Sequence, residues 1–352
     1  MHYNLSVITE ECRELTKRVD YKKFRKRTIL ITGANGLIGG FLADFFCYLN
    51  DKHDLGIKIH LTSYSNLTNV IRIRHLLHRS DLEYFSWDCS NSVSPFVLPK
   101  KIDYCFFCSG YGQPSKFLKN NIKTSLINVV GVDSLLSWML QHGGGNFLFL
   151  STSEIYGNPP ETMIPTPETY GGLYDLSNNR AAYKVSKCLG EVICKEYNRD
   201  ETMNVKIARV ALTYGPGTLL NDNRVLQEFI FKARKGMVRM LDGGESLRNY
   251  LYLTDSAELL INILFGKEMV YNVGGDTEEI SILNLANMIS KNFGAKVVPG
   301  KSKLDSVKSA PKGVSLDMTR ARKEFKTFGH NLTGLDKGIK QVIRWYNFED
   351  KE

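Results

Sequence analysis

The sequence lacks an apolar run of the roughly 18 residues that a membrane-spanning helix requires. Residues 1–27 are polar and charged, where a secretory signal would need an apolar stretch. Internal repeats, low-complexity tracts and flexible linkers are missing as well. We therefore expect a chain that folds as one cooperative unit, has no membrane partner and works in the cytoplasm.

Metal-ligand spacing is a second absence. The seven cysteines are odd in number and are not spaced as zinc ligands with the seven histidines, so we expect reduced thiols and no metal site. The pair Cys105 and Cys108 forms a C-x-x-C motif inside an apolar stretch that is typical of a buried strand. Residues three apart on a strand point to opposite faces, which favours a structural role over a redox or zinc role.

Positive charge is in excess, with a net charge of +9. Residues 1–27 carry eight Lys and Arg against four acidic residues, a net of +4, which leaves +5 for the rest of the chain. Ile8, Cys12, Leu15 and Val19 recur at helical spacing, so this extension is predicted to be an amphipathic helix docked on the body with its basic end in solvent. A solvated charged face is favoured over a polyanion site, and we expect no nucleic-acid partner.

Short apolar strands alternate with helices from residue 28 onward. Such alternation is typical of a doubly wound parallel sheet, so we expect an α/β fold of the Rossmann type with a smaller C-terminal α/β substrate lobe. The expected strands are 28–32, 58–61, 103–108, 146–151, 205–210, 250–253 and 269–273. The expected helices are 37–49, 122–141, 181–198, 224–235, 255–265, 282–293 and 335–347.

Three glycines follow the first apolar strand directly and open a helix. In that context the first glycine permits a tight turn, the second lets the backbone approach a pyrophosphate, and the third lets helix and strand pack closely. The helix N-terminus then meets the negative charge. The turn predicts a dinucleotide site with contacts from Gly33, Asn35, Gly36, Leu37, Ile38 and Gly39.

This site suggests a division of the chain. Residues 1–27 would form the basic helical extension and residues 28–211 the dinucleotide-binding Rossmann domain. Residues 212–249 and 276–352 would form the substrate lobe, with 250–275 returning to the Rossmann domain.

The sequence gives fewer indications of which residues would contact the adenosine of the dinucleotide. The acidic residue that normally holds the adenosine ribose at the end of the next strand is missing from Leu61–Asn66. NAD is expected, with NADP as the alternative, because Arg72 and Arg74 are candidates for binding a 2′-phosphate or for surface charges on a helix. Asp88 ends a later apolar stretch, where it would accept from the adenine amine or be a solvated loop acid.

Tyr183 and Lys187 are four residues apart and so lie one turn apart on one face of the predicted helix 181–198. This spacing places an ammonium beside a phenol, whose ordinary pKa is about 10. The lysine and an oxidised nicotinamide, both cationic, are expected to lower the pKa of Tyr183 and make it a base near neutral pH. Both residues are therefore predicted to be catalytic and to contact the cofactor.

Thr152 follows the apolar strand 146–151 and so lies at the carboxyl edge of the predicted sheet, where ligands of open α/β folds bind. Its hydroxyl is expected to share a proton with the alcohol being oxidised, and a turn cap is the structural alternative. Glu154 suggests a second proton-transfer step, because simple alcohol oxidation needs no carboxylate there. The alternative for Glu154 is a solvated loop acid.

With these motifs the chain resembles the extended short-chain dehydrogenase/reductase superfamily, in its nucleotide-sugar epimerase, dehydratase and decarboxylase group. The similarity runs from about Lys26 to Asn347. The stretches Ser151–Gly157, Asn179–Tyr183 and Asn221–Val225 look most like those of UDP-glucuronate decarboxylases. The resemblance implies an NAD-dependent enzyme that acts on a nucleotide sugar, and it implies a homodimer that pairs through helices 122–141 and 181–198.

The resemblance also implies roles for single residues. Thr152, Tyr183 and Lys187 are the implied shared catalytic set, with Ser153 and Glu154 handling the substrate-specific step. The implied substrate-binding residues are Arg180, Asn221, Arg224 and Arg248, and the planar guanidinium of Arg248 suits either a diphosphate or a sugar acid. The chain departs from the family at Leu212, which replaces the amide that usually contacts the nucleotide sugar, so the base and the sugar stay open.

The first hypothesis is transient oxidation of a sugar C4 hydroxyl followed by decarboxylation of a nucleotide-linked uronic acid. The alternatives are 4,6-dehydration and 4- or 5-epimerisation. A non-catalytic cofactor-binding scaffold is disfavoured by the intact Thr152, Tyr183 and Lys187. An RNA-binding module would rest on the basic extension alone. Synthesis of surface-polysaccharide precursors is the expected setting.

Overall fold

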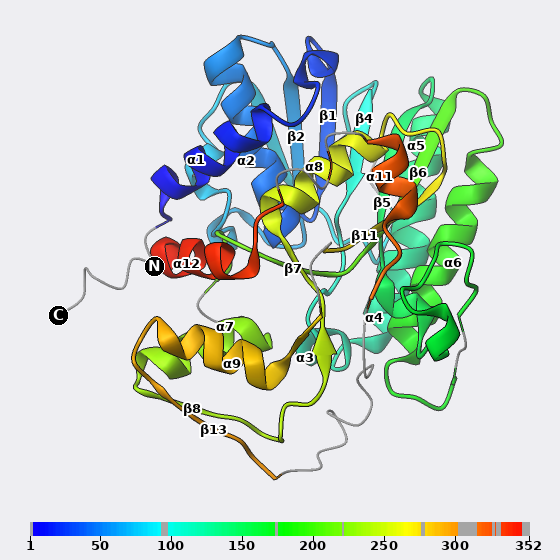
Figure 1. Ribbon diagram of the computed structural model, residues 1–352. Coiled ribbons are helices and arrows are strands. Elements are labelled where there is room, and N and C mark those ends of the chain that lie inside the picture. The colour runs from blue at the N-terminus through cyan, green and yellow to red at the C-terminus, as the bar shows by residue number, and fades with distance from the viewer. Residues whose placement is uncertain are drawn as a thin grey trace.

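A sheet of seven parallel strands organises the protein (Figure 1). The computed structural model describes residues 3–92, 98–172, 175–219, 222–275, 279–301, 315–325, 328 and 332–346. The strand order is β11-β6-β5-β4-β1-β2-β3, and every neighbouring pair is parallel. The strands are β1 (Thr28–Thr32), β2 (Lys58–Ser63), β3 (Leu82–Ser86), β4 (Tyr104–Phe107), β5 (Gly145–Thr152), β6 (Met203–Val210) and β11 (Val270–Val273).

The chain reverses its direction of travel across the sheet between β1 and β4. It runs outward through β2 and β3, returns to β4 beside β1, and then runs outward through β5, β6 and β11. In open parallel sheets the ligand lies outside the carboxyl ends of the strands at this reversal. The predicted Rossmann-type fold is confirmed, and its crevice position follows from the strand order.

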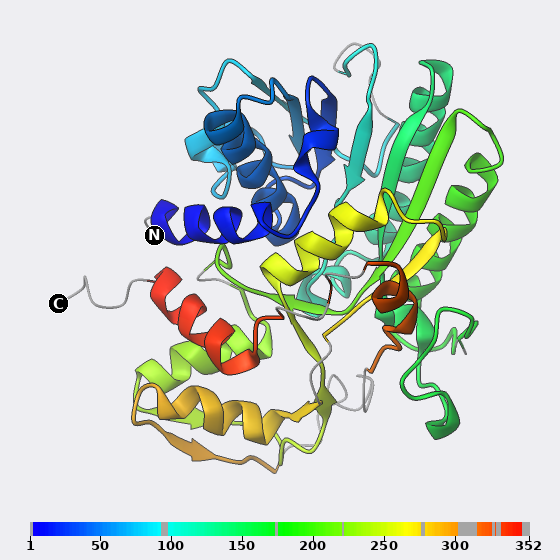
Figure 2. The same cartoon turned by 45° about the horizontal axis from the view of Figure 1, so that its top comes forward.

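Helices cover both faces of the sheet (Figures 1 and 2). On one face α2 (Leu37–His53) and α8 (Leu253–Ile263) pack on the strands and on each other. On the other face lie α4 (Asn121–Leu126), a turn of π-helix at Ile127–Gly131, α5 (Val132–Gln141) and α6 (Ala181–Tyr197). Two buried hydrophobic clusters fill the two interfaces.

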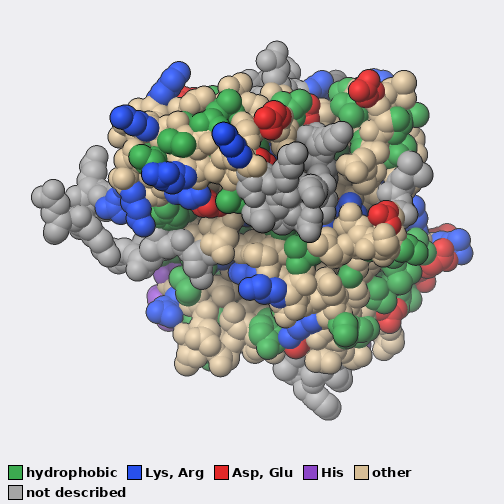
Figure 3. Space-filling view, turned by 90° about the horizontal axis from the view of Figure 1, so that it is seen from below, with side chains coloured by type: hydrophobic (Ala, Val, Ile, Leu, Met, Phe, Trp, Pro, Cys, Tyr) green, Lys and Arg blue, Asp and Glu red, His purple; other side chains and the backbone are tan. Residues whose placement is uncertain are grey.

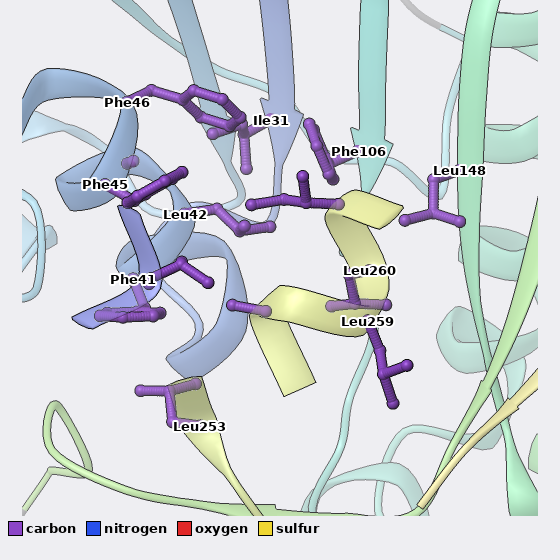
Figure 4. Packing of buried hydrophobic residues seen from close by; sticks show 14 of the residues in the cluster. Ile31, Phe41, Leu42, Phe45, Phe46, Phe106, Leu148, Leu253, Leu259 and Leu260 are labelled. Atoms are coloured by element: carbon purple, nitrogen blue, oxygen red, sulfur yellow. The ribbon is translucent and has the colours of Figure 1, made fainter. Parts of the chain in front are cut away.

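The alternation of side chains along the strands builds these two clusters. Figure 4 shows Phe41, Leu42, Phe45 and Phe46 of α2 facing Leu259 and Leu260 of α8 over the strand residues Ile31 and Phe106. Leu30 and Phe107, one position along, point into the other cluster. Cys105 belongs to the second cluster and Cys108 packs against the first, so the two thiols lie on opposite faces, as predicted.

A smaller lobe lies beyond the carboxyl edge of the sheet. Its helices are α7 (Val225–Arg234), α9 (Ile282–Lys291) and α12 (Leu335–Tyr346), which share a third hydrophobic cluster. Outside the main sheet the described residues form three short strand pairs: β7 (Leu212–Tyr214) with β10 (Tyr250–Tyr252), β9 (Leu247–Arg248) with β12 (Ile280–Ser281), and β8 (Met237–Arg239) with β13 (Lys296–Val298). Two further short helices are α3 (Pro114–Phe117) and α11 (Thr319–Glu324).

The N-terminal extension contains the predicted amphipathic helix. Helix α1 (Leu5–Thr16) buries Val7, Ile8, Cys12 and Leu15 against α2 and α8 (Figure 2). Its one deeply buried acid, Glu11, accepts hydrogen bonds from the hydroxyls of Tyr252, at 2.7 Å, and Thr254. Residues that are remote in sequence therefore hold the helix on the body. The division of the chain into domains stays a prediction.

Much of the positive charge of the extension is paired. The ion pairs are Lys17 with Glu14, Arg18 with Asp255, Lys23 with Asp20 and Arg27 with Asp103. Figure 3 shows the same mixed character on another face, where Lys and Arg side chains stand among acidic, hydrophobic and uncharged ones. Basic residues of the extension and of this face (Figure 3) therefore have acidic neighbours.

Among the residues that the structure describes, we find no helix with the length and apolarity needed to cross a bilayer.

Replacing Glu11 with Ala is expected to lower the free energy of unfolding by about 1–3 kcal/mol, because two buried hydroxyls lose their acceptor. Urea unfolding followed by circular dichroism measures this change. The matched control is Glu14→Ala on the same helix, whose carboxylate is exposed and pairs with Lys17, so its loss is expected to stay below about 1 kcal/mol. Equal losses in the two variants would contradict the anchoring role of Glu11.

Candidate active site

The turn between β1 and α2 leaves no room for a Cβ atom at Gly33 or Gly36. Gly33 has φ +64°, and a Cβ atom there would lie 2.6 Å from the Cys108 carbonyl oxygen. Gly36 is the N-cap of α2, and a Cβ atom on it would lie 2.9 Å from the Gly33 carbonyl oxygen. No side chain among the described residues caps α2, so the first-turn N–H groups at Leu37 and Ile38 face outward.

This turn fits the pyrophosphate of a dinucleotide. The close backbone packing forms a surface without Cβ atoms, and the open N–H groups of a 17-residue helix supply partial positive charge. Asn35 supports the turn from the side: its amide oxygen accepts from the backbone N–H groups of Ile71 and Arg72, and its amide nitrogen donates to Ser65 at 3.1 Å. Asn35 thereby joins the turn to the segment after β2.

The two arginines after β2 are engaged with backbone oxygens. Arg72 is buried, and its guanidinium donates to the carbonyl oxygens of Gly217 and Asn35, both at 2.6 Å. Arg74 donates to the carbonyl oxygens of Thr68 and Val70. The interpretation of Arg72 as a surface charge on a helix is therefore wrong, because its guanidinium joins the segment after β2 to the loop after β7.

Tyr183 of α6 lies beside Thr152, the last residue of β5. Its phenol lies close to the Thr152 hydroxyl, and its ring stacks on Phe117 with 4.4 Å between centroids and 3° between planes. Thr152 also accepts from the backbone N–H of Glu154 at 3.2 Å, so it serves the site and caps the following turn. Phe117 is buried, and no motif in the sequence indicates its contact with Tyr183.

The pKa of Tyr183 is raised by the protein alone, and the lowering expected from a bound oxidised nicotinamide stays a prediction. Burial raises the pKa of the phenol, and the nearby Glu154 carboxylate raises it further, while the Thr152 hydroxyl and Arg180 act in the opposite direction. Lys187 points elsewhere: its ammonium donates to the Leu150 carbonyl oxygen at 2.6 Å. Helical spacing placed the two side chains on one face but did not fix the direction of the ammonium.

Lys187 is itself a buried cation. Its Nζ lies 4.5 Å from the centroid of the Phe149 ring. Burial lowers the pKa of Lys187 from 10.5 to about 8, and nearby thiols and Glu191 oppose this shift. An amine with that pKa changes its charge close to neutral pH.

Glu154 is not a solvated loop acid. Its carboxylate forms a bidentate ion pair with Arg180, with Nε to Oε2 at 3.0 Å and a second, shorter contact between Nη2 and Oε1. The Arg180 guanidinium also lies 5.0 Å from the centroid of the Phe117 ring. Phe117 thus contacts both Tyr183 and Arg180, and the charged pair lies beside the phenol.

The remaining predicted substrate residues fall into two groups. Arg248 lies close enough to Glu154 and Arg180 for their charges to affect its pKa, which burial lowers. Arg224 forms a bidentate pair with the buried Asp222 and donates to the Thr213 carbonyl oxygen. The sequence did not single out Tyr250. Burial raises the pKa of its phenol, and the positive charges of Arg248 and Arg224 oppose that rise. Ser153 is buried in the turn after β5, and Asn221 lies outside the described residues.

Asp88 is occupied by protein partners. One carboxylate oxygen accepts from the Lys123 ammonium at 2.7 Å, and the other accepts from the backbone and side chain of Ser90. It is therefore a paired acid rather than a free one.

A buried polar network supports the site from behind. Glu191, two turns after Tyr183 on α6, pairs bidentately with Arg209 of β6 at 2.8 and 3.0 Å and accepts from the Ser151 hydroxyl at 2.6 Å. Arg209 also donates to Tyr156. These contacts fix α6 against the strand ends that carry Thr152.

The fold and this site define an NAD-dependent enzyme of the short-chain dehydrogenase/reductase type. The chain belongs to the NAD dependent epimerase/dehydratase family, whose model matches residues 29–274. UDP-glucuronic acid decarboxylase 1 of Xenopus tropicalis is 28% identical over 330 residues, which cover 93% of this chain and 74% of that protein. UDP-glucuronic acid decarboxylase 1 of Arabidopsis thaliana is 30% identical over 279 residues, which cover 78% and 61%.

Solved structures with similar folds include several sugar-nucleotide enzymes. The UDP-glucuronic acid 4-epimerase of Bacillus cereus, solved with UDP-glucuronic acid and NAD, matches with a TM-score of 0.73 at 21% identity over 91% of this chain and 99% of that one. The dTDP-glucose 4,6-dehydratase of Bacillus anthracis, solved with NAD, matches with a TM-score of 0.75 at 17% identity over 92% and 97%. At these identities the matches show a common fold.

Replacing Lys187 with Met is expected to raise the free energy of unfolding at pH 7 by up to about 3 kcal/mol, because the buried ammonium has a pKa of about 8 in the folded chain against 10.5. The penalty of burying the charge is complete below pH 8 and disappears as the pH rises to 10.5, so the gain should shrink over that interval. Urea unfolding between pH 7 and pH 10.5 measures it. A gain that is independent of pH would contradict a buried charged lysine.

Proposed function

We propose that this enzyme decarboxylates a nucleotide-linked uronic acid of the UDP-glucuronate type through transient oxidation at C4. The observation that carries the proposal is the position of Glu154 and Arg180, with Arg248 close by, directly beside the Tyr183 phenol. A C6 carboxylate lies next to the C4 hydroxyl on a pyranose ring, so it would meet these guanidinium groups when the hydroxyl meets Tyr183. The similarity to UDP-glucuronic acid decarboxylases supports the same reaction.

In the proposed reaction Tyr183, as phenolate, accepts the proton of the C4 hydroxyl, and the Thr152 hydroxyl orients that oxygen. NAD, when bound at the glycine turn, supplies the hydride acceptor and returns the hydride at the end of the cycle. Lys187 contributes positive charge from the same face of α6, with its ammonium held on the Leu150 carbonyl oxygen. Arg248 and Arg180 hold the carboxylate until the 4-keto sugar, now a β-keto acid, releases carbon dioxide.

Because Tyr183 is buried, the proposed reaction requires positive charge near its phenol to stabilise the phenolate. Because its pKa is raised, the phenol gives up its proton only when nearby positive charge favours the phenolate. The pairing of Glu154 with Arg180 serves this need, since it offsets the negative charge that opposes ionisation. Stacking on Phe117 restricts the ring, so the oxygen keeps one direction.

Dehydration is the second candidate function, and one observation favours it. Glu154 is a carboxylate fixed beside the site, which a 4,6-dehydratase would use to remove the C5 hydrogen. In that case Arg180 would orient a catalytic acid or base rather than bind a substrate carboxylate.

Product mass separates these reactions. Purified protein with NAD is incubated with UDP-, GDP-, CDP- and dTDP-linked sugars and uronic acids, and the products are weighed. Decarboxylation is expected, seen as a loss of about 44 mass units from UDP-glucuronate, against about 18 for dehydration and none for epimerisation. Tyr183→Phe is expected to remove turnover by at least about a hundredfold while leaving NAD binding within a few-fold. Full activity of that variant, or no loss of 44 with any uronic acid, would overturn the proposal.

The proposed assembly is a homodimer. Apolar side chains at helical spacing are exposed along one stripe of α4 and α6, with Ile122 79% exposed and Val192 50% exposed. The stripe consists of Ile122, Leu126, Val185, Leu189 and Val192. A second copy of this chain would cover it by pairing the two stripes about a twofold axis.

Leu189→Arg is expected to shift the protein to monomer at micromolar concentration, because a charge at the centre of the stripe would be buried without a partner. Sedimentation velocity measures the mass. The control Lys195→Glu lies on the same helix at its exposed end and should leave the mass unchanged. A wild-type monomer, or a Leu189→Arg dimer as stable as the wild type, would contradict this assembly.

A further inference from the structure

The end of β2 carries neutral hydroxyl groups, whereas dinucleotide sites usually have a carboxylate there. Where a carboxylate normally accepts from the adenosine ribose, the chain has Ser63, Tyr64 and Ser65. The Ser63 hydroxyl lies 2.8 Å from the Tyr84 hydroxyl on β3, and Tyr84 donates to the Ser65 carbonyl oxygen. The Ser65 hydroxyl accepts from Asn35. The strand end is thus a closed set of neutral hydrogen bonds.

A cation lies over this neutral strand end. The Lys123 ammonium of α4 is 3.7 Å from the centroid of the Tyr64 ring, and that ring is 67% exposed. Asp88, after β3, binds the same ammonium at 2.7 Å and is itself held by Ser90. Lys123 is therefore supported on two sides, by an aromatic face and by a carboxylate, and a quarter of its side chain stays exposed.

The other charged residues near the end of β2 bind groups of the protein itself. Arg72 is buried on backbone oxygens, and Arg74 is bound to the carbonyl oxygens of Thr68 and Val70. Asp88, the predicted partner of the adenine amine, is occupied by Lys123 and Ser90. An ammonium paired with Asp88 therefore lies beside the strand end that usually carries an unpaired carboxylate.

We propose that Lys123, held by Asp88 and the Tyr64 ring, is the residue that meets the 2′-position of the adenosine ribose, and that the site consequently accepts a 2′-phosphate. A carboxylate accepts from ribose hydroxyls and repels a phosphate, whereas an ammonium donates to hydroxyls and attracts a phosphate. The protein should therefore bind NADP about as well as NAD. This inference concerns the cofactor only and does not depend on which sugar is the substrate.

The charge of the lysine is secure at neutral pH. Although partial burial opposes it, the hydrogen bond and the charge of Asp88 raise the pKa of Lys123. The pair with Asp88 also means that the 2′-phosphate would join an existing ion pair, which limits the gain in affinity. Comparable binding of the two cofactors, rather than a strong preference for NADP, is the expected result.

Equilibrium binding tests the inference without any catalysis. Protein stripped of nucleotide is titrated with NAD and with NADP by isothermal titration calorimetry. The expected ratio of the two dissociation constants is within about tenfold, which is the effect of one charge-assisted contact. Binding of NADP that is more than about tenfold weaker than binding of NAD would overturn the proposal.

Two variants assign the effect to its residue. Lys123→Met is expected to weaken the binding of NADP roughly tenfold or more relative to the binding of NAD. The control is Lys119→Met, which replaces an exposed lysine four residues earlier and should leave the ratio of the two dissociation constants unchanged. Ser63→Asp restores the missing carboxylate next to the Tyr84 hydroxyl and is expected to shift the ratio toward NAD by a similar factor. An unchanged ratio in Lys123→Met, or equal effects of the two lysine variants, would overturn the assignment, and thermal melts check that each variant is folded.

Discussion

The buried ion pair between Glu191 and Arg209 is the contact on which the geometry of the site depends. It joins α6 to β6, and the Ser151 hydroxyl on Glu191 joins the same helix to β5. Removing one partner would leave an uncompensated buried charge, which is far more costly than the net value of the pair. The pair therefore works as a fixed reference that sets the rotation of α6, and with it the direction in which Tyr183 and Lys187 face the strand ends.

A second constraint is electrostatic. The site collects ionisable groups in a poorly hydrated space, where each charge acts strongly on its neighbours. Burial raises the pKa of the Tyr183 phenol and lowers the pKa of the Lys187 ammonium, so it favours the neutral form of each group. In the proposed reaction, ionisation of Tyr183 would depend on the positive charge of a bound dinucleotide. Proton transfer would then be coupled to cofactor binding.

The sequence predicted the parts of this site that local rules determine. The glycine turn, the strand before it and the Tyr-Lys spacing each follow from periodicity and from the steric needs of one backbone position, and the structure has all three. Strand β3 was not predicted, because it lies at the sheet edge and its residues are mostly half-buried or exposed, which weakens the apolar pattern. The helix predicted over 122–141 contains the π-turn at 127–131, where Gly131 packs on the Cys89 carbonyl oxygen.

Contacts between remote residues could not be predicted from the sequence. The stacking of Phe117 on Tyr183, and the pairing of Glu154 with Arg180, depend on how the loop after β4 folds across the loop after β5. Propensity and spacing carry no information about such contacts, since each residue has several equally good local environments. The direction of a side chain is equally hard to predict. Lys187 lies on the predicted face of its helix, but its ammonium donates to the Leu150 backbone carbonyl.

The two ends of the cofactor site show different tolerance to change for a physical reason. At the nicotinamide end a shift of about 1 Å between reacting atoms is costly, so the residue types there are those that the chemistry needs. At the adenosine end the protein contributes only binding free energy, and one favourable contact is readily exchanged for another of similar size. The chain has Thr152, Tyr183 and Lys187 at the proposed nicotinamide end, and near the proposed adenosine end it has Lys123 paired with Asp88. A change of residue at the adenosine end would therefore cost the proposed reaction least.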